Sequence, residues 1–150
     1  MKIRFLILNP EDYNLSNDYI FASNPWGVYF YKTYESMNYV TALAQCESDG
    51  AFLAYPRSEA ENDFILSLIP STDIWIGISD VDEEGTVVAS DGQDIVFTKW
   101  YSPEQPASTN NRPDAALIRG ASRWAQNLPG YWNWQLATNA HEFVCYYRIS

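Results

Sequence analysis

The sequence predicts a single α+β domain with two helices, short antiparallel strands and one long irregular loop. Residues 75–92 form an apolar run followed by Glu-Gly and Asp-Gly pairs, which is typical of short strands joined by tight turns. Two segments, near 38–46 and 58–69, repeat apolar residues at helical spacing. Residues 101–131 contain four prolines and little periodicity, which indicates a long loop of the kind that usually carries function.

Composition limits the chain to one core and excludes some partners. The chain has 150 residues, of which 47% are hydrophobic and 16% aromatic, enough for one domain. The formal net charge is −10 and the nine basic residues form no patch, so nucleic acid is a poor partner. No apolar run approaches the roughly 20 residues of a membrane span. We interpret Ile3 to Leu8 as a strand, because this stretch is too short for a secretory signal, and the secretion route is left open.

The remaining elements follow in order. Residues 1–24 are interpreted as an N-terminal extension and 25–150 as the domain, which opens with a strand at 26–32. The first helix begins near Ser36 or Asn38 and ends at Cys46. Its predicted buried side carries Val40, Ala42, Leu43 and Cys46.

The second helix begins with a capping box. Ser58 and Glu61 are spaced so that each side chain can accept a hydrogen bond from a backbone N–H of the first turn. Phe64, Ile65 and Leu68 then follow at helical spacing.

The two cysteines allow two interpretations. Lone cysteines are commonly buried apolar residues. Here Cys46 ends the first helix, and Cys145 lies in an aromatic run, 143–147, that predicts the final strand.

Several motifs together resemble the C-type lectin-like domain. They are Trp75-Ile-Gly-Ile78, Glu84-Gly85, Asp91-Gly92, Trp100 and the segment Gly50-Ala-Phe-Leu-Ala54, and the resemblance covers about residues 25–147. It implies the α+β C-type lectin-like fold, a binding function without catalysis, and a long disulfide between Cys46 and Cys145. Such a disulfide indicates an oxidising compartment, and therefore an extracellular, cell-surface or virion-surface location. Ala115 and Ala137 stand where the family's second disulfide would be.

The same resemblance identifies a calcium site that this sequence does not complete. The family's first triplet reads Gln105-Pro106-Ala107 here, its later acid falls at Pro113, and its last triplet reads Trp132-Asn133-Trp134. Calcium requires several hard oxygen ligands. Because only Gln105 and Asn133 still offer side-chain oxygens, we expect no calcium and no other cofactor there. The family also implies a cis peptide bond before Pro106.

A second group of acids has the spacing of a metal site. Asp80, Asp82, Glu84 and Asp91 have the spacing of an EF-hand-like loop, with Gly85 at its sixth position. That loop normally lies between two helices, whereas strands flank it here. We therefore interpret it as an acidic, solvated hairpin turn.

Catalytic interpretations find little support. His141 is the only histidine, has the spacing of no metal motif and precedes the last strand. No G-x-S-x-G motif is present, and no pair of carboxylates stands out by its spacing. The sequence therefore predicts a binding module and not an enzyme.

Aromatic, arginine and amide residues gather around the long loop and its exit. Such residues are typical of binding hot spots and of stacking platforms for sugars. We expect Trp132 to be buried and Trp134 to be an exposed contact. The predicted ligand-binding residues are Gln105, Arg112, Asp114, Arg119, Trp124, Tyr131, Asn133 and Trp134.

The favoured ligand is a secreted or cell-surface protein, bound without calcium. The alternatives are calcium-independent glycan binding through aromatic stacking and amides, and a structural role in a larger adhesin or virion protein. The sequence does not indicate the oligomeric state.

Overall fold

The structure is a computed structural model that describes residues 9–24, 27–101, 114–120 and 129–149. Its elements occur in the following order: the 3-10 helix η1 (Pro10–Tyr13), β1 (Ile20–Asn24), β2 (Gly27–Asn38), α1 (Tyr39–Ser48), β3 (Phe52–Leu53), α2 (Glu59–Leu68), β4 (Ile74–Ser79), β5 (Val88–Ala89), β6 (Asp114–Ile118), β7 (Trp132–Leu136) and β8 (Ala140–Arg148). The α+β class with two helices is confirmed.

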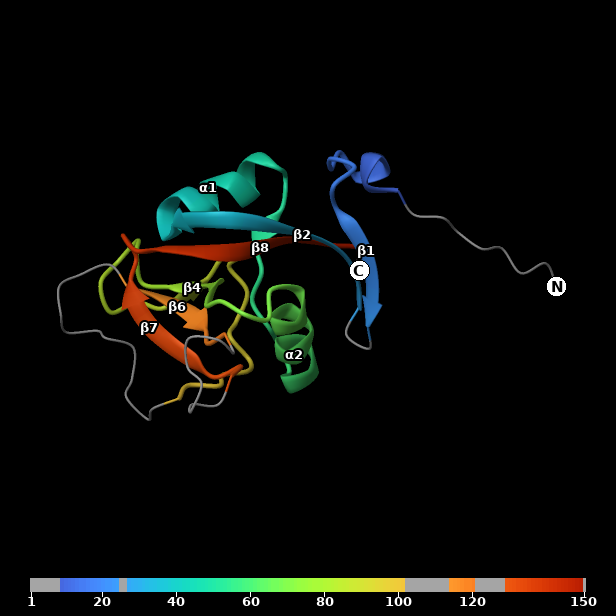
Figure 1. The fold of residues 1–150 in the computed structure, drawn as a ribbon. Coiled ribbons are helices and arrows are strands. Elements are labelled where there is room, and N and C mark those ends of the chain that lie inside the picture. Colours follow the sequence, from blue (N-terminus) through green and yellow to red (C-terminus); the bar gives the residue numbers. More distant parts are fainter. Residues whose placement is uncertain (1–8, 25–26, 102–113, 121–128, 150) are drawn as a thin grey trace.

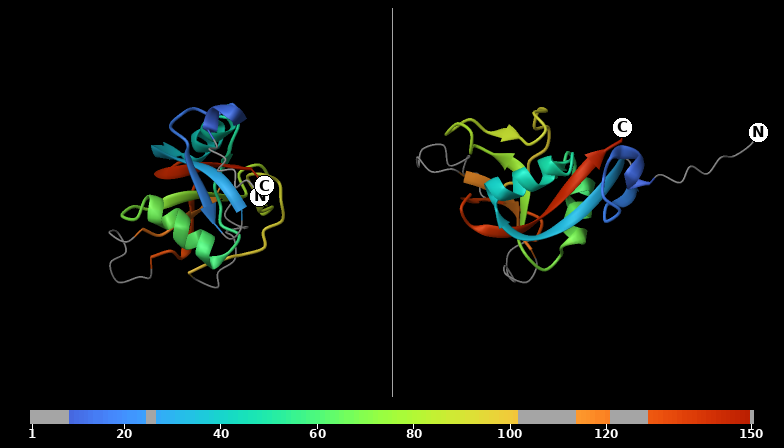
Figure 2. Two further views of the ribbon diagram at one scale, coloured as in Figure 1. Left: turned by 90° about the vertical axis from the view of Figure 1, so that its right-hand side faces the viewer. Right: turned by 90° about the horizontal axis from the view of Figure 1, so that it is seen from above.

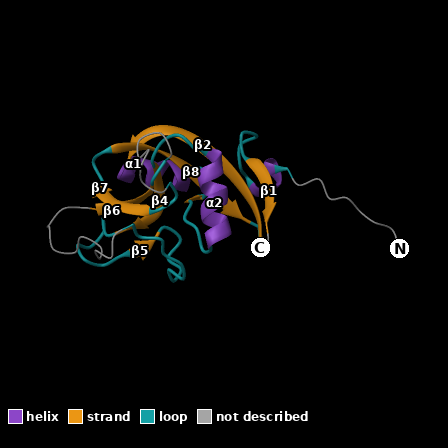
Figure 3. Ribbon diagram, turned by 60° about the horizontal axis from the view of Figure 1, so that its bottom comes forward, coloured by secondary structure: helices purple, strands orange, loops and turns teal. Residues whose placement is uncertain are grey.

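The strands form one sheet in the order β1-β2-β8-β4-β6-β7, with β3 beside β8 and β5 beside β4. The β4–β8 pair is parallel and the other pairs are antiparallel. The long strands β2 and β8 cross the molecule below α1, while α2 lies on the other side of them (Figure 1; Figure 2). Strands β5, β6 and β7 lie at the end of the molecule opposite β1 (Figure 3). Among the described helices, none has the length and apolar character of a membrane span.

The two helices begin at the predicted caps, but two side chains differ from prediction. The Asn38 side chain accepts a hydrogen bond from Thr41 N (2.9 Å), and Ser58 Oγ accepts one from Glu61 N (3.1 Å). Val40 is 60% exposed, because the buried stripe of α1 runs through its neighbour Tyr39 instead. Glu61 does not complete the capping box. Its side chain turns inward and is fully buried.

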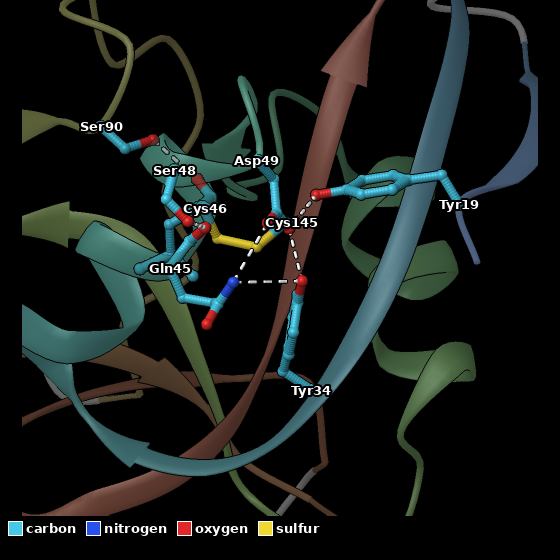
Figure 4. Close-up of a disulfide and its surroundings, with 9 residues drawn as sticks. Tyr19, Tyr34, Gln45, Cys46, Ser48, Asp49, Ser90 and Cys145 are labelled. Carbon is cyan, nitrogen blue, oxygen red and sulfur yellow. Dashed lines mark hydrogen bonds between the residues drawn. A yellow bond between two sulfur atoms is a disulfide. The ribbon is translucent and has the colours of Figure 1, made fainter. Parts of the chain in front are cut away.

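The disulfide between Cys46 and Cys145 is confirmed. It joins the last turn of α1 to β8 across a sequence separation of 99, with 5.3 Å between the two Cα atoms. Both cysteines are fully buried (Figure 4). Closing so long a loop contributes about 4 to 5 kcal/mol in the chain-entropy model. Ala115 and Ala137 are buried in the same apolar cluster.

Residues 9–24 pack against the end of α1. The Tyr19 hydroxyl donates to Asp49 Oδ2 (2.8 Å), and the Tyr34 hydroxyl donates to the same oxygen (Figure 4). Gln45 Nε2 donates to the other oxygen of Asp49 at 3.1 Å. Strand β1 adds an antiparallel partner to β2. The division between an extension and a domain at residues 24 and 25 stays a prediction, and the expected strand at 3–8 lies outside the described residues.

Candidate ligand-binding site

Three segments meet where β6 ends and β7 begins. In the antiparallel pair, Asn133 lies opposite Leu117 and Trp134 opposite Ala116. The chain at 99–101 runs along the other edge of β7, because Tyr101 N donates to Trp132 O (3.0 Å) and Trp132 N donates to Lys99 O (2.8 Å). Residues 99–101, 119 and 131–134 are therefore neighbours although they lie far apart in the sequence.

Arg119 is the centre of this arrangement. It is only 3% exposed, and its backbone N donates to Tyr131 O at 2.8 Å. Its guanidinium carbon lies 3.5 Å from the centroid of the Tyr101 ring, which is a close cation–π contact. Its Nε donates to Asn133 Oδ1 at 2.7 Å. One buried cation thus orients an aromatic ring and an amide. We call Tyr101, Arg119, Tyr131 and Asn133 the Arg119 surface.

Tyr101 is the most exposed aromatic residue of this surface, with 45% of its area accessible. Its ring meets the Tyr131 ring edge-on at 6.4 Å, and Lys99 Nζ lies 4.8 Å from the centroid of the Tyr131 ring. Lys99 also pairs with Glu59 at the start of α2. Tyr101 is not among the ligand-binding residues predicted from the sequence. Its place directly after Trp100, where the long loop begins, was the available signal.

The two tryptophans of β7 pack away from this surface. Trp132 is buried as expected, and its Nε1 donates to Asn62 Oδ1 at 2.7 Å. Trp134 stacks on Trp100, with ring centroids 4.6 Å apart and an interplanar angle of 16°. Trp134 is therefore half-buried and not the exposed contact we expected. Alternate residues of a strand face opposite sides, which separates Trp134 from its neighbour Asn133. A binding role for Trp134 stays a prediction.

Several predicted site residues lie outside the described residues. They are Gln105, Arg112 and Trp124, together with the peptide bond before Pro106. Of the remaining five, Arg119, Tyr131 and Asn133 come together, Trp134 lies on the other face of β7, and Asp114 lies at the opposite end of β6. At the rise of a strand, Asp114 and Arg119 are about 16 Å apart along the chain.

At that opposite end, Asp114 belongs to an acidic cluster. One carboxylate oxygen from each of Asp80, Glu84 and Asp114 lies within 4.8 Å of the others. Asp80 is 1% exposed, and its two oxygens accept hydrogen bonds from Asp114 N (2.9 Å) and Gly85 N (3.1 Å). Three hard oxygen donors suit a calcium-like cation chemically. Our expectation of no calcium rested on the long-loop positions alone and did not consider this cluster.

The EF-hand-like interpretation is not supported by these positions. Asp82 is exposed and lies outside the cluster. Asp91 instead accepts hydrogen bonds from Arg57 Nη2 (2.8 Å) and the Tyr55 hydroxyl (2.8 Å). The alternative of a solvated turn is wrong for Asp80, whose carboxylate is buried because it holds two backbone amides.

The sequence matches the Lectin C-type domain family over residues 35–147. The chain belongs to this family. Domains of the family bind ligands and do not catalyse reactions, which agrees with the expectation from the sequence. A long disulfide and membership of the family are both in keeping with a secreted or surface protein.

Similar proteins include lectins and a receptor. This chain is 38% identical to the mannose-binding protein of Gallus gallus over 80 residues, 53% of this chain and 31% of that protein. It is 30% identical to the low affinity immunoglobulin epsilon Fc receptor of Mus musculus over 89 residues, 59% of this chain and 27% of the receptor. It therefore spans about a third or less of these two proteins. Lectin BRA-3 of Megabalanus rosa is 30% identical over 118 residues, 78% of this chain and 68% of that lectin.

Solved structures share the fold. The cow C-type carbohydrate-recognition domain of CD23, crystallised in the presence of GlcNAc2Man3 oligosaccharide, has a TM-score of 0.68 at 22% identity, covering 90% of this chain and 96% of that domain. A calcium-independent type II antifreeze protein has a TM-score of 0.69 at 19% identity, covering 89% of this chain and 93% of that protein.

Proposed function

We propose that this domain binds carbohydrate at the Arg119 surface and does so without calcium. The resemblance to the mannose-binding protein of Gallus gallus and to Lectin BRA-3 supports a glycan over the protein ligand that the sequence first favoured. The single observation that carries the proposal is the buried Arg119, which holds an exposed tyrosine ring on one side and an amide on the other.

This arrangement has the two features that sugar binding needs. A partly exposed aromatic ring can pack against the apolar C–H face of a sugar. Hydrogen-bonding groups placed beside the ring then orient the sugar hydroxyls. Asn133 Oδ1 accepts from Arg119, so its amide nitrogen is the group that can donate to a hydroxyl. Both groups are held in place before the ligand arrives, which lowers the entropy cost of binding.

The contacts of Asn133 also argue against calcium at this place. Its side-chain oxygen accepts a hydrogen bond from a guanidinium at 2.7 Å, and a second cation beside that group would be repelled. Its neighbour Trp134 offers no oxygen ligand from its side chain. The residues described here therefore do not fit a calcium ion at Asn133.

A glycan array in the presence of a chelator tests the proposal. We expect at least one glycan to bind, and Tyr101→Ala to weaken that binding by 10-fold or more, about 1.4 kcal/mol. Phe21→Ala is the matched control, because Phe21 is a similarly exposed aromatic residue (44%) on β1 at the other end of the molecule (Figure 1). A hit that Tyr101→Ala leaves unchanged would contradict the assignment of this surface.

A protein ligand is the second candidate, since one similar protein is named as an immunoglobulin receptor. In that case a pull-down from cell-surface proteins should recover a partner while the glycan array stays blank. Tyr101→Ala would then be expected to cost about 2 kcal/mol of binding, as truncation of an exposed aromatic hot spot does.

A further inference from the structure

A cavity lies away from the Arg119 surface, between α1 and the short strands β3 and β5. Its volume is about 340 Å³, within the usual range of small-molecule sites. It is lined by none of the residues of the Arg119 surface. The lining residues that matter here are Leu43, Glu47, Phe52, Val81, Asp82 and Val88.

Apolar side chains form part of the wall of this cavity and reach the surface. Phe52 is 47% exposed and Val88 is 40% exposed. Each belongs to a two-residue strand whose other residue, Leu53 or Ala89, is buried. Because side chains alternate along a strand, burying Leu53 and Ala89 leaves Phe52 and Val88 on the outer side. Hydroxyl and carboxylate side chains line the rest of the cavity, and such a mixture suits a ligand that has both an apolar and a polar part.

The rim carries two negative charges. Glu47 on α1 and Asp82 after β4 both line the cavity and are exposed, and no basic side chain is among the lining residues. Neither carboxylate forms an ion pair with any part of the chain that the structure describes. A ligand that places an apolar body against Phe52 and Val88 would therefore gain from a positive charge at the rim.

We propose that this cavity binds a small organic ammonium ion with an apolar body. The apolar part packs between Leu43, Phe52 and Val88, and the ammonium group lies near the Glu47 and Asp82 carboxylates. The two carboxylates select a cation over an anion, while the apolar walls select an organic cation over a metal ion.

The test uses 2-phenylethylammonium as the probe and the neutral 2-phenylethanol as its matched control. Amide chemical-shift changes of the ¹⁵N-labelled protein would be followed during each titration. We expect saturable shifts of residues 43–53 and 79–90 with the ammonium compound, and binding at least 5-fold weaker with the alcohol. Raising the salt concentration should reduce the difference in affinity between the two probes, because salt screens the charges of exposed carboxylates.

Variants then assign the contacts. Asp82→Asn and Glu47→Gln should each weaken binding of the ammonium probe at least 2-fold, and Phe52→Ser should weaken binding of both probes. Asp63→Asn removes the same charge from an exposed position on α2 and should change nothing. Equal affinity for the two probes would overturn the role of the carboxylates. Shifts that map to the Arg119 surface, or no shifts at all, would overturn the site.

Discussion

The two ends of strand β6 hold charge in opposite ways. At one end Arg119 is buried, and its positive charge is met by the Tyr101 ring and the Asn133 oxygen. At the other end, the carboxylates of Asp80, Glu84 and Asp114 lie close together, and the described hydrogen bonds to Asp80 come from backbone amides. The first end contains a cation of its own, the Arg119 guanidinium. The second end brings together carboxylate oxygens that suit a metal ion as ligands.

The two ends of β6 therefore differ in what they offer a metal ion. On the proposed function, a buried arginine orders the ligand surface at one end, while three carboxylates lie together at the other. The separation of about 16 Å along β6 allows each end to be changed without direct contact with the other. A third charged group, the buried acid Glu61 on α2, belongs to neither end.

The largest effect should come from Arg119→Met. The substitution removes a buried cation–π contact and a charge-assisted hydrogen bond, which together contribute about 3 kcal/mol. We expect ligand binding at the Arg119 surface to be lost, as measured on the array, and the free energy of unfolding to fall in urea. Arg119→Lys keeps the charge but not the planar fork, so it should restore binding only in part. Unchanged ligand binding by Arg119→Met would contradict the role assigned to Arg119.

Asp80→Ala should destabilise the other end of β6 without affecting the ligand. It leaves the amides of Asp114 and Gly85 without their acceptor, at a cost of about 2 kcal/mol. Urea unfolding gives the stability, and array binding should stay within 2-fold of the parent. Asp82 is an exposed residue of the same turn, so Asp82→Asn should change the free energy of unfolding by less than about 0.5 kcal/mol. Loss of glycan binding in Asp80→Ala would show that the two ends are coupled.

Glu61 on α2 provides a pH-dependent contrast, because it is an acid whose side chain is fully buried. Burial raises the pKa of Glu61 to about 7, although the Arg57 backbone amide and guanidinium act to lower it. The folded protein therefore holds this proton more tightly than the unfolded chain does. The contribution to stability is greatest at low pH and is lost as the pH rises from about 4.5 to 7.

We expect Glu61→Gln to remove this dependence. Unfolding free energies measured from pH 5 to pH 8 should fall by about 1 to 2 kcal/mol more in the parent than in the variant. Asp63→Asn, an exposed carboxyl on the same helix, should follow the parent. Parallel curves for Glu61→Gln and the parent would show that Glu61 does not titrate in this range.

Calcium should have the smallest effect on stability. From the long-loop positions we expect millimolar calcium to change the melting temperature by less than about 1 °C, since an ion that does not bind the native state cannot stabilise it. A larger rise in the melting temperature would indicate an ion. If Asp114→Asn abolishes that rise and Asp82→Asn does not, the ion lies at the acidic cluster. In that case the domain would bind calcium at a place other than the long-loop positions.

Local signals in the sequence predicted the helix caps at Asn38 and Ser58, which depend on residue type and on position within one element. The pairing of Cys46 with Cys145 was predicted by the family resemblance. The family resemblance likewise predicted the burial of Trp132.

The missed features depend on contacts between distant segments. Arg119 reaches Tyr101, and Asp80 reaches the backbone of Asp114, only once β4, β6 and the chain at 99–101 lie side by side. No local pattern encodes those contacts. The alternation of β7 was readable, however. It would have shown that Asn133 and Trp134 cannot face the same ligand group from one strand.

The central claim is that a buried arginine, and not calcium, orders the ligand surface. The most direct test measures the dissociation constant of the strongest array glycan, first in excess chelator and then in millimolar calcium. The claim predicts that the two values agree within 2-fold. Binding that disappears in chelator and returns with calcium would contradict it.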